Sequence, residues 1–387
     1  MNPTLGPIPS GACIGLLGGG QLARMIVLAG HPLGFRFLVL DPGASAPAAQ
    51  VGARQIAASY SDPAALAEMA CCCDLITYEF ENIDADTVAW LEQRVELPQG
   101  SLLLRTAQNR LKEKRALSEL NIPVTPFLEI YDEGRLQEAL ASFGRVVVKT
   151  VSGGYDGKGQ RIIHREEEIP EAFGKLHRHN EPLVAEQMLD FERELSVIVA
   201  RSRSGEVRCF PVAENLHMEN ILTISRIPAR IASSTEDQVK CIAKRIAKGL
   251  GLAGVMGVEL FHMKDGELHV NEIAPRPHNS GHFTQDACGI CQFEQHLRAI
   301  AGWPMGSSEL RNPAVMLNLL GDQLNRVLEK LHFLPSESRL HVYGKTEVHP
   351  GRKMGHLNLV SEDLQDLLDP LKRFRIWEPK MLESMLS

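Results

Sequence analysis

The sequence predicts an α/β protein of more than one domain whose first part forms a parallel sheet. The chain has 387 residues, which is more than one ordinary hydrophobic core accommodates. Residues 12–80 alternate between short apolar runs and helix-like segments, as parallel strands joined by helices do. The composition, 44% hydrophobic and 23% charged, is that of a globular protein.

The elements of this first part follow from local patterns. The run ACIGLL (12–17) predicts a strand, and residues 21–29 carry apolar side chains at helical spacing up to Gly30. FRFLVLD (35–41) predicts the second strand. Asp62, followed by Pro63, is a typical N-cap and first helical residue, and DLITYEF after that helix predicts a buried strand. This order is compatible with a Rossmann-like sheet.

A glycine-rich turn after the first strand raises the question of a dinucleotide. Residues 18–23, GGGQLA, fit the G-x-G-x-x-A fingerprint, and Asp41 ends the second strand, where an acidic residue can bind a ribose. An NAD-dependent dehydrogenase is therefore one hypothesis that the rest of the chain must test.

Charge and composition exclude several function classes. The formal net charge of −7 argues against electrostatic binding of nucleic acid. No apolar run approaches the roughly 20 residues of a membrane span, and the N-terminus shows no secretory pattern. Of the eight cysteines, the adjacent 71–73 indicate a buried helix end or strand start, and Cys288 and Cys291 form a lone C-x-x-C. We expect structural thiols in a reducing, cytoplasmic setting.

The pattern of predicted elements changes after the first hundred residues. Residues 106–120 predict one charged amphipathic helix, which the prolines of NIPVTPF end. Strands are predicted at RVVVKT (145–150), PLVAEQML (182–189) and RELSVIVAR (193–201). A helix end at Gly249 and a hairpin follow, and a smaller mixed segment begins at about Ala301.

The hairpin brings two acidic residues together. Asp265-Gly266 between apolar runs predicts a two-residue type I′ turn, and this register places Glu259 opposite Glu272. Like charges about 5 Å apart at Cβ repel each other. A divalent cation would relieve the repulsion, and Mg²⁺ is commonly held by one or two carboxylates together with phosphate oxygens. An exposed ribbon face screened by solvent is the alternative, and Asn271, another oxygen donor, favours the metal.

A glycine-rich loop behind a strand-ending lysine predicts a phosphate site. Lys149 is followed by GGYDGKGQ (153–160), whose backbone N–H groups can approach an anion. The loop is not a Walker A motif, because Gly159 stands where Ser or Thr is required. Together with the paired glutamates, it predicts a nucleotide site with its own magnesium. Because this site would already bind the nucleotide, the GGGQLA fingerprint is less strongly expected to bind NAD.

The order of these motifs resembles the ATP-grasp superfamily. A strand with a terminal lysine, the glycine loop, EQML…FERE and GVELF…NEIAPRPHNSGH occur in that order. More narrowly, the chain resembles the N5-carboxyaminoimidazole ribonucleotide synthetase family, the ATP-dependent carboxylases of purine biosynthesis, from Ile14 to about Asn358. The most specific pieces are GGGQLARM, TYEFENI, SGGYDGKGQ, APRPHNSGHFTQDAC, QFEQHLRAI and HPGRKMGHLN.

The resemblance implies an ATP-grasp fold in three domains. Residues 1–107 would form a Rossmann-like substrate domain, residues 108–300 the ATP-grasp domain with a glycine-rich lid, and residues 301–387 a small mixed α/β domain. ATP and Mg²⁺, with Mn²⁺ as an alternative, are the implied cofactors. A homodimer that binds neither nucleic acid nor membrane is implied as well.

The resemblance also implies the residues of the nucleotide site. Phosphates would contact Arg110 and Lys149, and the lid residues would fold over them. A hinge strand would face adenine, Glu194 would bind the ribose hydroxyls, and His217 would lie nearby. Glu259 and Glu272 would carry the metal. The implied lid, hinge and remaining nucleotide residues are Gly154, Tyr155, Asp156, Gly157, Lys158, Gly159, Gln160, Glu186, Gln187, Met188, Leu189, Asn271 and Glu272.

The implied reaction carboxylates 5-aminoimidazole ribonucleotide with ATP and bicarbonate through carboxyphosphate. Bicarbonate and carboxyphosphate would be held and shielded by Tyr155, Arg276, His278 and Lys353, and His278 could accept the amine proton if its pKa lies near 6.5. The ribonucleotide would bind at Gly19, Gly20, Gln21, Glu79 and Asn82, with Lys345 and Arg352 on its 5′-phosphate. At the glycine turn, either its phosphate or its ribose would face the helix N-terminus.

Three alternatives stay open at this stage. Another ATP-grasp ligase, such as a formate-dependent glycinamide ribonucleotide transformylase, would share the nucleotide site. An NAD-dependent dehydrogenase would use the first fingerprint instead. A catalytically inactive ATP-grasp protein would serve as a binding module.

Overall fold

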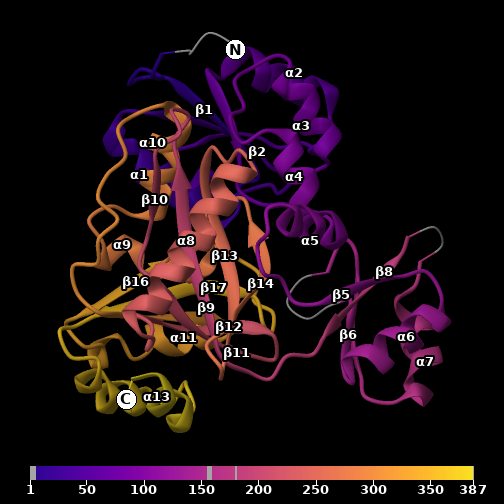
Figure 1. The fold of residues 1–387 in the computed structure, drawn as a ribbon. Helices are drawn as coiled ribbons and strands as arrows, with labels where there is room; N and C mark the ends of the chain where they lie inside the picture. Colours follow the sequence, from indigo (N-terminus) through magenta and orange to yellow (C-terminus); the bar gives the residue numbers. More distant parts are fainter. Residues whose placement is uncertain (1–5, 155–158, 179–180, 387) are drawn as a thin grey trace.

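The computed structural model describes residues 6–154, 159–178 and 181–386, and three sheets organise them (Figure 1). A parallel sheet forms the N-terminal part, a small antiparallel sheet forms a separate lobe, and a long antiparallel sheet runs through the centre. Among the described residues no helix is both long and apolar enough to cross a membrane.

The N-terminal sheet confirms the predicted parallel arrangement. Its strands lie in the order β3-β2-β1-β4, and every pairing is parallel. The Asp62 carboxylate accepts hydrogen bonds from the first turn of α2, as predicted for an N-cap. The strands are β1 (Cys13–Leu17), β2 (Arg36–Leu40), β3 (Arg54–Ile56) and β4 (Leu75–Tyr78), and the helices are α1 (Gln21–Gly30), α2 (Pro63–Cys72) and α3 (Ala85–Glu92).

The single helix predicted over residues 106–120 is wrong. The structure has two helices there, α4 (Ser101–Ala107) and α5 (Arg110–Glu119). The Asn109 side chain accepts hydrogen bonds from the backbone N–H groups of Leu111 and Lys112 and caps a new helix. Because such a cap satisfies N–H groups that a continuous helix would bond internally, it interrupts the periodic pattern.

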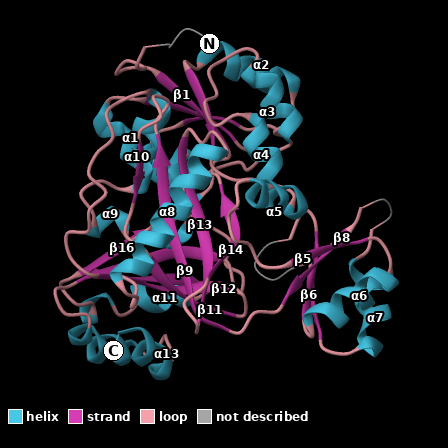
Figure 2. Cartoon of the chain, in the orientation of Figure 1, coloured by secondary structure: helices cyan, strands magenta, loops and turns pink. Residues whose placement is uncertain are grey.

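In the part of the chain that the structure describes, the small lobe is a four-stranded antiparallel sheet with two helices, and it includes the strands that carry Lys149 and Gln187. Its sheet has the order β5-β8-β6-β7, and α6 and α7 pack on it (Figure 2). The strands are β5 (Phe127–Ile130), β6 (Val146–Thr150), β7 (Gln160–Ile163) and β8 (Leu183–Gln187), and the helices are α6 (Glu133–Phe143) and α7 (Ile169–Leu176).

The central sheet continues through the C-terminal part of the chain. Its order is β14-β13-β9-β11-β12-β15-β17-β16, and β10 pairs with β9. The three C-terminal strands therefore extend the same sheet. Its strands are β9 (Phe191–Arg201), β10 (Val207–Cys209), β11 (Ala213–Met218), β12 (Ile221–Ile227), β13 (Gly254–Met263), β14 (Leu268–Ala274), β15 (Ala314–Leu320), β16 (Ser338–Val342) and β17 (Lys353–Val360).

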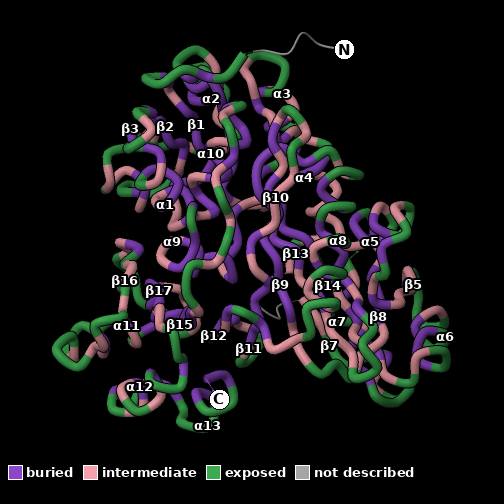
Figure 3. The backbone as a smooth tube through the Cα atoms, turned by 60° about the vertical axis from the view of Figure 1, so that its left-hand side comes forward, coloured by how far each residue is buried: buried purple, intermediate pink, exposed green. Residues whose placement is uncertain are grey.

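Helices cover this sheet and bury its middle strands (Figure 3). One apolar cluster lies between α8 and strands β9, β13 and β14, and a second lies between β15, β17 and the last helices. The helices are α8 (Ser233–Gly249), α9 (Thr284–Ala287), α10 (Gln292–Ala301), α11 (Gln323–Leu328), α12 (Leu368–Phe374) and α13 (Pro379–Leu386).

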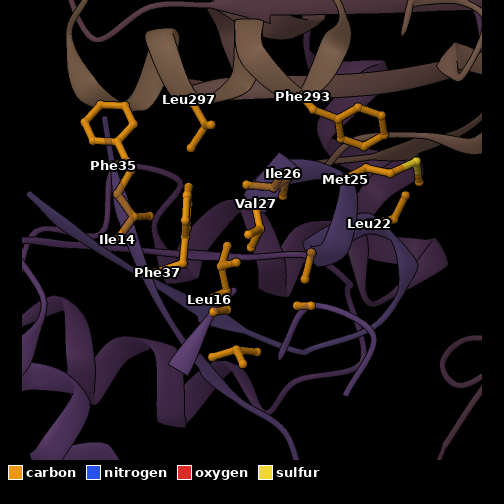
Figure 4. Close-up of a cluster of buried hydrophobic side chains, with 14 of the residues drawn as sticks. Ile14, Leu16, Leu22, Met25, Ile26, Val27, Phe35, Phe37, Phe293 and Leu297 are labelled. Carbon is orange, nitrogen blue, oxygen red and sulfur yellow. The ribbon is translucent and has the colours of Figure 1, made fainter. Parts of the chain in front are cut away.

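A shared core fixes the N-terminal part against the central part. Phe293 and Leu297 of α10 pack against Met25 and Ile26 of α1 and against the parallel sheet (Figure 4). Because interiors pack as densely as organic crystals, this contact fixes α1 and the parallel sheet relative to α10.

The cysteine prediction holds only in part. Cys73 is buried, as expected, but Cys71 and Cys72 are exposed at the end of α2.

Candidate functional site

One cavity of about 460 Å³ lies where the three sheets meet, and it gathers most of the predicted nucleotide and bicarbonate residues. The helix α5, the small lobe and the central sheet all contribute to its wall. Its predicted members are Asn82, Arg110, Lys149, Gly154, Gln160, Glu186, Gln187, Met188, Leu189, Glu194, His217, Glu259, Asn271, Glu272, Arg276, His278 and Lys353. The predicted residues Tyr155, Asp156, Gly157 and Lys158 lie outside the described residues.

The acidic pair on the hairpin is confirmed, although the predicted turn is wrong. Glu259 pairs directly with Glu272 across β13 and β14. The turn is a three-residue loop: the Met263 N–H donates to the Glu267 carbonyl (2.9 Å), and the Gly266 N–H donates to the Met263 carbonyl (3.0 Å). Gly266 has a φ of +90°, which suits this bulged turn rather than type I′.

A second irregularity restores the register that the turn shifts. Leu260 pairs with Val270, so Asn271 is an extra residue on β14. The bulge cancels the one-residue shift at the turn and brings Glu272 back opposite Glu259. Asn271 and Glu272 are neighbours in sequence, yet both line the cavity, which a regular strand would prevent.

The donor set fits a hard divalent cation. Burial and the neighbouring Glu272 carboxylate raise the pKa of Glu259 to about 7, so this pair is poorly stabilised without a positive charge. Two carboxylates and an amide oxygen are oxygen donors of the kind that Mg²⁺ prefers. The residues present therefore fit the predicted metal.

A buried carboxylate joins two lysines at the opposite wall. Lys149 Nζ lies 2.7 Å from Glu186 Oε2, and Lys114 Nζ lies 3.1 Å from Glu186 Oε1. Burial would raise the pKa of Glu186, but the two ammonium groups outweigh it and hold the pKa at about 2. The Glu186 carboxylate thus fixes Lys149, whose side chain remains 16% exposed towards the cavity.

Sequence reasoning missed two charged residues on α5. Lys114 and Glu113 are buried and line the cavity beside the predicted Arg110. Burial and the Glu272 charge raise the pKa of Glu113, whose carboxylate accepts a hydrogen bond from the backbone of Ile273. Their positions in the sequence could have predicted them. Both residues follow Arg110 at a spacing of three or four, which places them on the same face of the helix as Arg110.

Glu194 and His217 are brought together, as predicted. His217 Nδ1 contacts a carboxylate oxygen of Glu194, and both side chains line the cavity. Burial would lower the pKa of His217, but the hydrogen bond and charge of Glu194 outweigh it and raise the pKa.

Arg276 is held by a residue that was not predicted. Both carboxylate oxygens of Glu81 contact its guanidinium, with Nη2 at 2.9 Å from Oε1. Burial would raise the pKa of Glu81, but Arg276 outweighs it and holds the pKa at about 2. Glu81 lies in the motif TYEFENI, which carried part of the family resemblance. It was not among the predicted site residues.

The ordinary pKa expected for His278 is wrong. Burial, followed by the charge of Arg276, lowers the pKa of its imidazole to about 3, so the ring is neutral near pH 7. The Ser280 hydroxyl lies 2.9 Å from Nδ1, and Glu259 Oε1 lies 3.4 Å from Nε2. His278 is therefore a weak base near pH 7 and can hydrogen-bond through its neutral ring.

Carboxylates already occupy the donors of the glycine turn. Asp41 accepts the Gly19 N–H (2.9 Å), and Glu79 accepts the N–H groups of Gly20 and Ala23, the latter at 2.7 Å. A phosphate at this helix N-terminus would meet two like charges. Of the two predicted ligands for the turn, this arrangement favours ribose hydroxyls over phosphate.

The same contacts explain why the fingerprint misled. The Asp41 carboxylate also accepts hydrogen bonds from the Gly43 N–H (2.8 Å) and the Tyr60 hydroxyl (3.1 Å), so it is not open to a dinucleotide ribose. A Cβ built on Gly19 would lie 2.5 Å from the Ala46 side chain. The segment after β2 thus covers the turn against which a pyrophosphate would rest.

Lys345 lies near Glu79, which accepts hydrogen bonds from the glycine turn, and Arg352 lies near Lys345; both are outside the cavity lining. Lys345 Nζ donates to the Lys353 carbonyl (2.8 Å), and its charge interacts with Glu79. Burial, followed by the charge of Arg352, lowers the pKa of Lys345 to about 8. Arg352 donates to the carbonyl and the carboxylate of Glu347. Gln21, also predicted, begins α1 and is partly buried.

Comparisons with known proteins cover nearly all of the chain. Family models match at residues 12–108 (ribonucleotide synthetase preATP-grasp domain), 115–293 (ATP-grasp domain) and 314–369 (phosphoribosylaminoimidazole carboxylase C-terminal domain). The N5-carboxyaminoimidazole ribonucleotide synthase of Bacillus subtilis is 43% identical over 353 residues, which span 91% of this chain and 92% of that protein. The Brucella melitensis synthase is also 43% identical, over 90% of this chain and 96% of its own length.

Solved structures agree with these matches. An N5-carboxyaminoimidazole ribonucleotide synthetase in complex with ADP superposes with a TM-score of 0.92 at 44% identity and covers 97% of this chain and 99% of its own. A synthase from Aspergillus clavatus, solved with ADP and 5-aminoimidazole ribonucleotide, gives a TM-score of 0.87 at 29% identity, over 97% and 99% of the two chains.

Proposed function

Because this chain belongs to the N5-carboxyaminoimidazole ribonucleotide synthase family of ATP-grasp enzymes, we propose that it carboxylates 5-aminoimidazole ribonucleotide with ATP and bicarbonate. The products are N5-carboxyaminoimidazole ribonucleotide, ADP and phosphate. The observation that carries the proposal is the facing pair Glu259 and Glu272 in one cavity with Lys149 and Arg276. This combination provides a cation site and two positive groups around the position of a transferred phosphoryl group.

The chain's own groups can position the phosphoryl transfer. The γ-phosphoryl group is transferred to bicarbonate, a poor electrophile, to give carboxyphosphate. Phosphoryl transfer depends mainly on positioning and on neutralising charge, and Lys149 and Arg276 supply fixed positive charge. Glu186 orients Lys149, and Glu81 orients Arg276.

Glu259, Glu272 and the Asn271 amide oxygen would hold Mg²⁺. When bound, the ion neutralises phosphate charge during the transfer. Mg²⁺ is the proposed ion, and Mn²⁺ is the alternative.

The second half-reaction uses the N-terminal part of the chain. Carboxyphosphate releases CO₂, which the exocyclic amine of the ribonucleotide attacks. The ribose is proposed to lie at the glycine turn beside Glu79, and its 5′-phosphate at Lys345 and Arg352. Neutral His278 and Lys353, both in the cavity wall, would hydrogen-bond to bicarbonate and shield carboxyphosphate from water.

An acceptor assay tests the proposed function. With ATP and Mg²⁺, ADP release should require 5-aminoimidazole ribonucleotide together with bicarbonate, and the carboxylated product should appear in equal amount. Stimulation by glycinamide ribonucleotide with formate, without any response to 5-aminoimidazole ribonucleotide, would contradict it. ATP binding without turnover under either condition would indicate a binding module.

Lys353→Ala should impair bicarbonate use more than ATP affinity. Its side chain lines the cavity, and its charge acts on Glu259 of the acidic pair. We expect KM for bicarbonate to rise about tenfold, as for the loss of one charge-assisted contact of about 1.4 kcal/mol, with KM for ATP nearly constant. Steady-state kinetics check this, with Lys372→Ala, at an exposed ion pair with Glu383, as the control. Unchanged bicarbonate kinetics would remove Lys353 from the site.

The affinity for the ribonucleotide should fall at alkaline pH. A lysine attracts phosphate only as the ammonium form, and the pKa of Lys345 is lowered to about 8. As the pH rises through about 8, the charged fraction falls, so kcat/KM for the ribonucleotide should fall by up to about tenfold per pH unit. Lys345→Arg keeps its positive charge over this pH range, so it should reduce the fall of kcat/KM with rising pH. A profile from about pH 6.5 to about pH 9.5 that is identical in both proteins would contradict the assignment.

Two further properties are proposed from the resemblance. We propose a homodimer in the cytoplasm. Light scattering of the purified protein and cell fractionation test them, and a monomer at micromolar concentration would contradict the first.

A further inference from the structure

Two cysteines from neighbouring elements of the N-terminal sheet meet at its amino end. Cys13 begins β1, and Cys73 follows α2 just before β4. The Asp74 N–H donates to the Cys13 carbonyl (2.9 Å), and the Cys13 N–H donates to the Asp74 carboxylate (2.8 Å). The two thiols lie close enough for each to shift the pKa of the other.

The backbone brings the two cysteines next to each other. Ile14 pairs with Leu75, and the hydrogen bond from the Asp74 N–H to the Cys13 carbonyl holds the residue after Cys73 against Cys13. Cys73 itself precedes the strand, because β4 begins at Leu75. A disulfide requires Cα atoms no more than about 6.8 Å apart, which directly adjacent backbone segments allow.

The sulfur of Cys73 also lies on the correct face of β1. A Cβ built on Gly15 would be 2.9 Å from Cys73 Sγ. Because residues two apart on a strand point to the same face, the Cys13 side chain points to the face on which this sulfur lies.

The surroundings of Cys13 favour the thiolate, which is the reactive form. The hydrogen bond from Cys73, together with the charges of Arg36 and Arg54, lowers the pKa of Cys13 to about 7. The side chain is partly exposed. By contrast, burial raises the pKa of Cys209 to about 11 and that of Cys288 to about 12.

We propose that Cys13 and Cys73 are a thiol pair that hydrogen peroxide oxidises to a reversible disulfide. The Cys13 thiolate attacks one peroxide oxygen, the O–O bond breaks, and the released hydroxide takes up a proton to give water and a sulfenic acid. The Cys73 sulfur then attacks the Cys13 sulfur, and its proton leaves with the hydroxyl group as a second water. Two thiols lose two electrons, and one peroxide is reduced to two waters.

Cys73 is the resolving residue rather than its exposed neighbours Cys71 and Cys72. Its pKa is the one that the Cys13 thiol raises, and its sulfur lies against β1, whereas those two lie on the last turn of α2. In the reduced protein, the hydrogen bond and charge of Cys13 raise the pKa of Cys73. Oxidation of Cys13 removes both effects and makes the Cys73 thiol easier to deprotonate.

Peptide mapping after peroxide treatment tests the proposal on the full chain. The protein is treated with hydrogen peroxide, free thiols are blocked with N-ethylmaleimide, and peptides are analysed by tandem mass spectrometry. We expect a Cys13–Cys73 linkage that dithiothreitol reverses. The linkage should persist in the Cys71→Ser/Cys72→Ser double variant and disappear in Cys73→Ser, where Cys13 should be trapped as the sulfenic acid by dimedone.

The wild-type protein supplies a measurement that needs no variant. Near pH 7, iodoacetamide should alkylate Cys13 faster than the exposed Cys241. Equal or slower alkylation of Cys13, absence of the linkage after peroxide, or a linkage that joins Cys13 to Cys71 or Cys72 would each overturn the proposal.

Discussion

Glu272→Gln is expected to lower magnesium-dependent turnover by about 100-fold or more while the protein stays folded. The side chain is exposed to the cavity rather than part of the core, so its replacement by an isosteric amide leaves the packing intact. Loss of a partner that merely orients a metal ligand lowers metal affinity or activity by about 10–100-fold. Loss of the ligand itself should lower activity by at least the upper value. ADP release measured over a range of Mg²⁺ concentrations checks the prediction.

Glu267→Gln is the matched control, because it lies on the same hairpin but next to the turn, with its side chain 69% exposed. It should behave like the unaltered protein. Full activity of Glu272→Gln at low Mg²⁺ would contradict the metal assignment.

Glu81→Gln should separate ATP cleavage from carboxylation. Its carboxylate makes two contacts with the Arg276 guanidinium, and the amide can accept only one of them. Misplacement of a catalytic group by about 1 Å can cost about 100-fold. We expect kcat for product formation to fall by about that factor, KM for bicarbonate to rise, and ADP to exceed product. Quantifying both products in one reaction measures the effect.

The control for Glu81→Gln is Glu68→Gln, which alters an exposed ion pair between Glu68 of α2 and Arg54 of β3 in the same N-terminal part. That change should leave the ratio of ADP to product at one. If Glu81→Gln lowered both rates equally and left bicarbonate affinity unchanged, a positioning role for Glu81 would be wrong.

The hairpin shows which structural features local sequence patterns can predict and which they cannot. The apolar runs and Asp265-Gly266 correctly predicted the ribbon and the facing glutamates. They did not predict the three-residue loop or the extra residue at Asn271. Each irregularity shifts the register by one residue, and only their cancellation preserves the pair. A bulge depends on cross-strand packing and cavity contacts, which a local pattern does not contain.

The glycine turn illustrates a different limit. The fingerprint correctly predicted a tight turn between β1 and α1, because glycine spacing reports backbone geometry. Its ligand depends on partners distant in sequence: Glu79 takes the Gly20 N–H, and Ala46 covers Gly19. The buried charges Glu113 and Lys114 were missed although their spacing from Arg110 places them on its helix face, because the same α5 pattern is also that of a solvated face.

The fate of oxygen from bicarbonate tests the central claim most directly. When the reaction is run with 18O-labelled bicarbonate, ATP and 5-aminoimidazole ribonucleotide, phosphoryl transfer to bicarbonate predicts one labelled oxygen in each phosphate released. Phosphate free of label, with carboxylated product still forming, would contradict the account of a cavity built to phosphorylate bicarbonate.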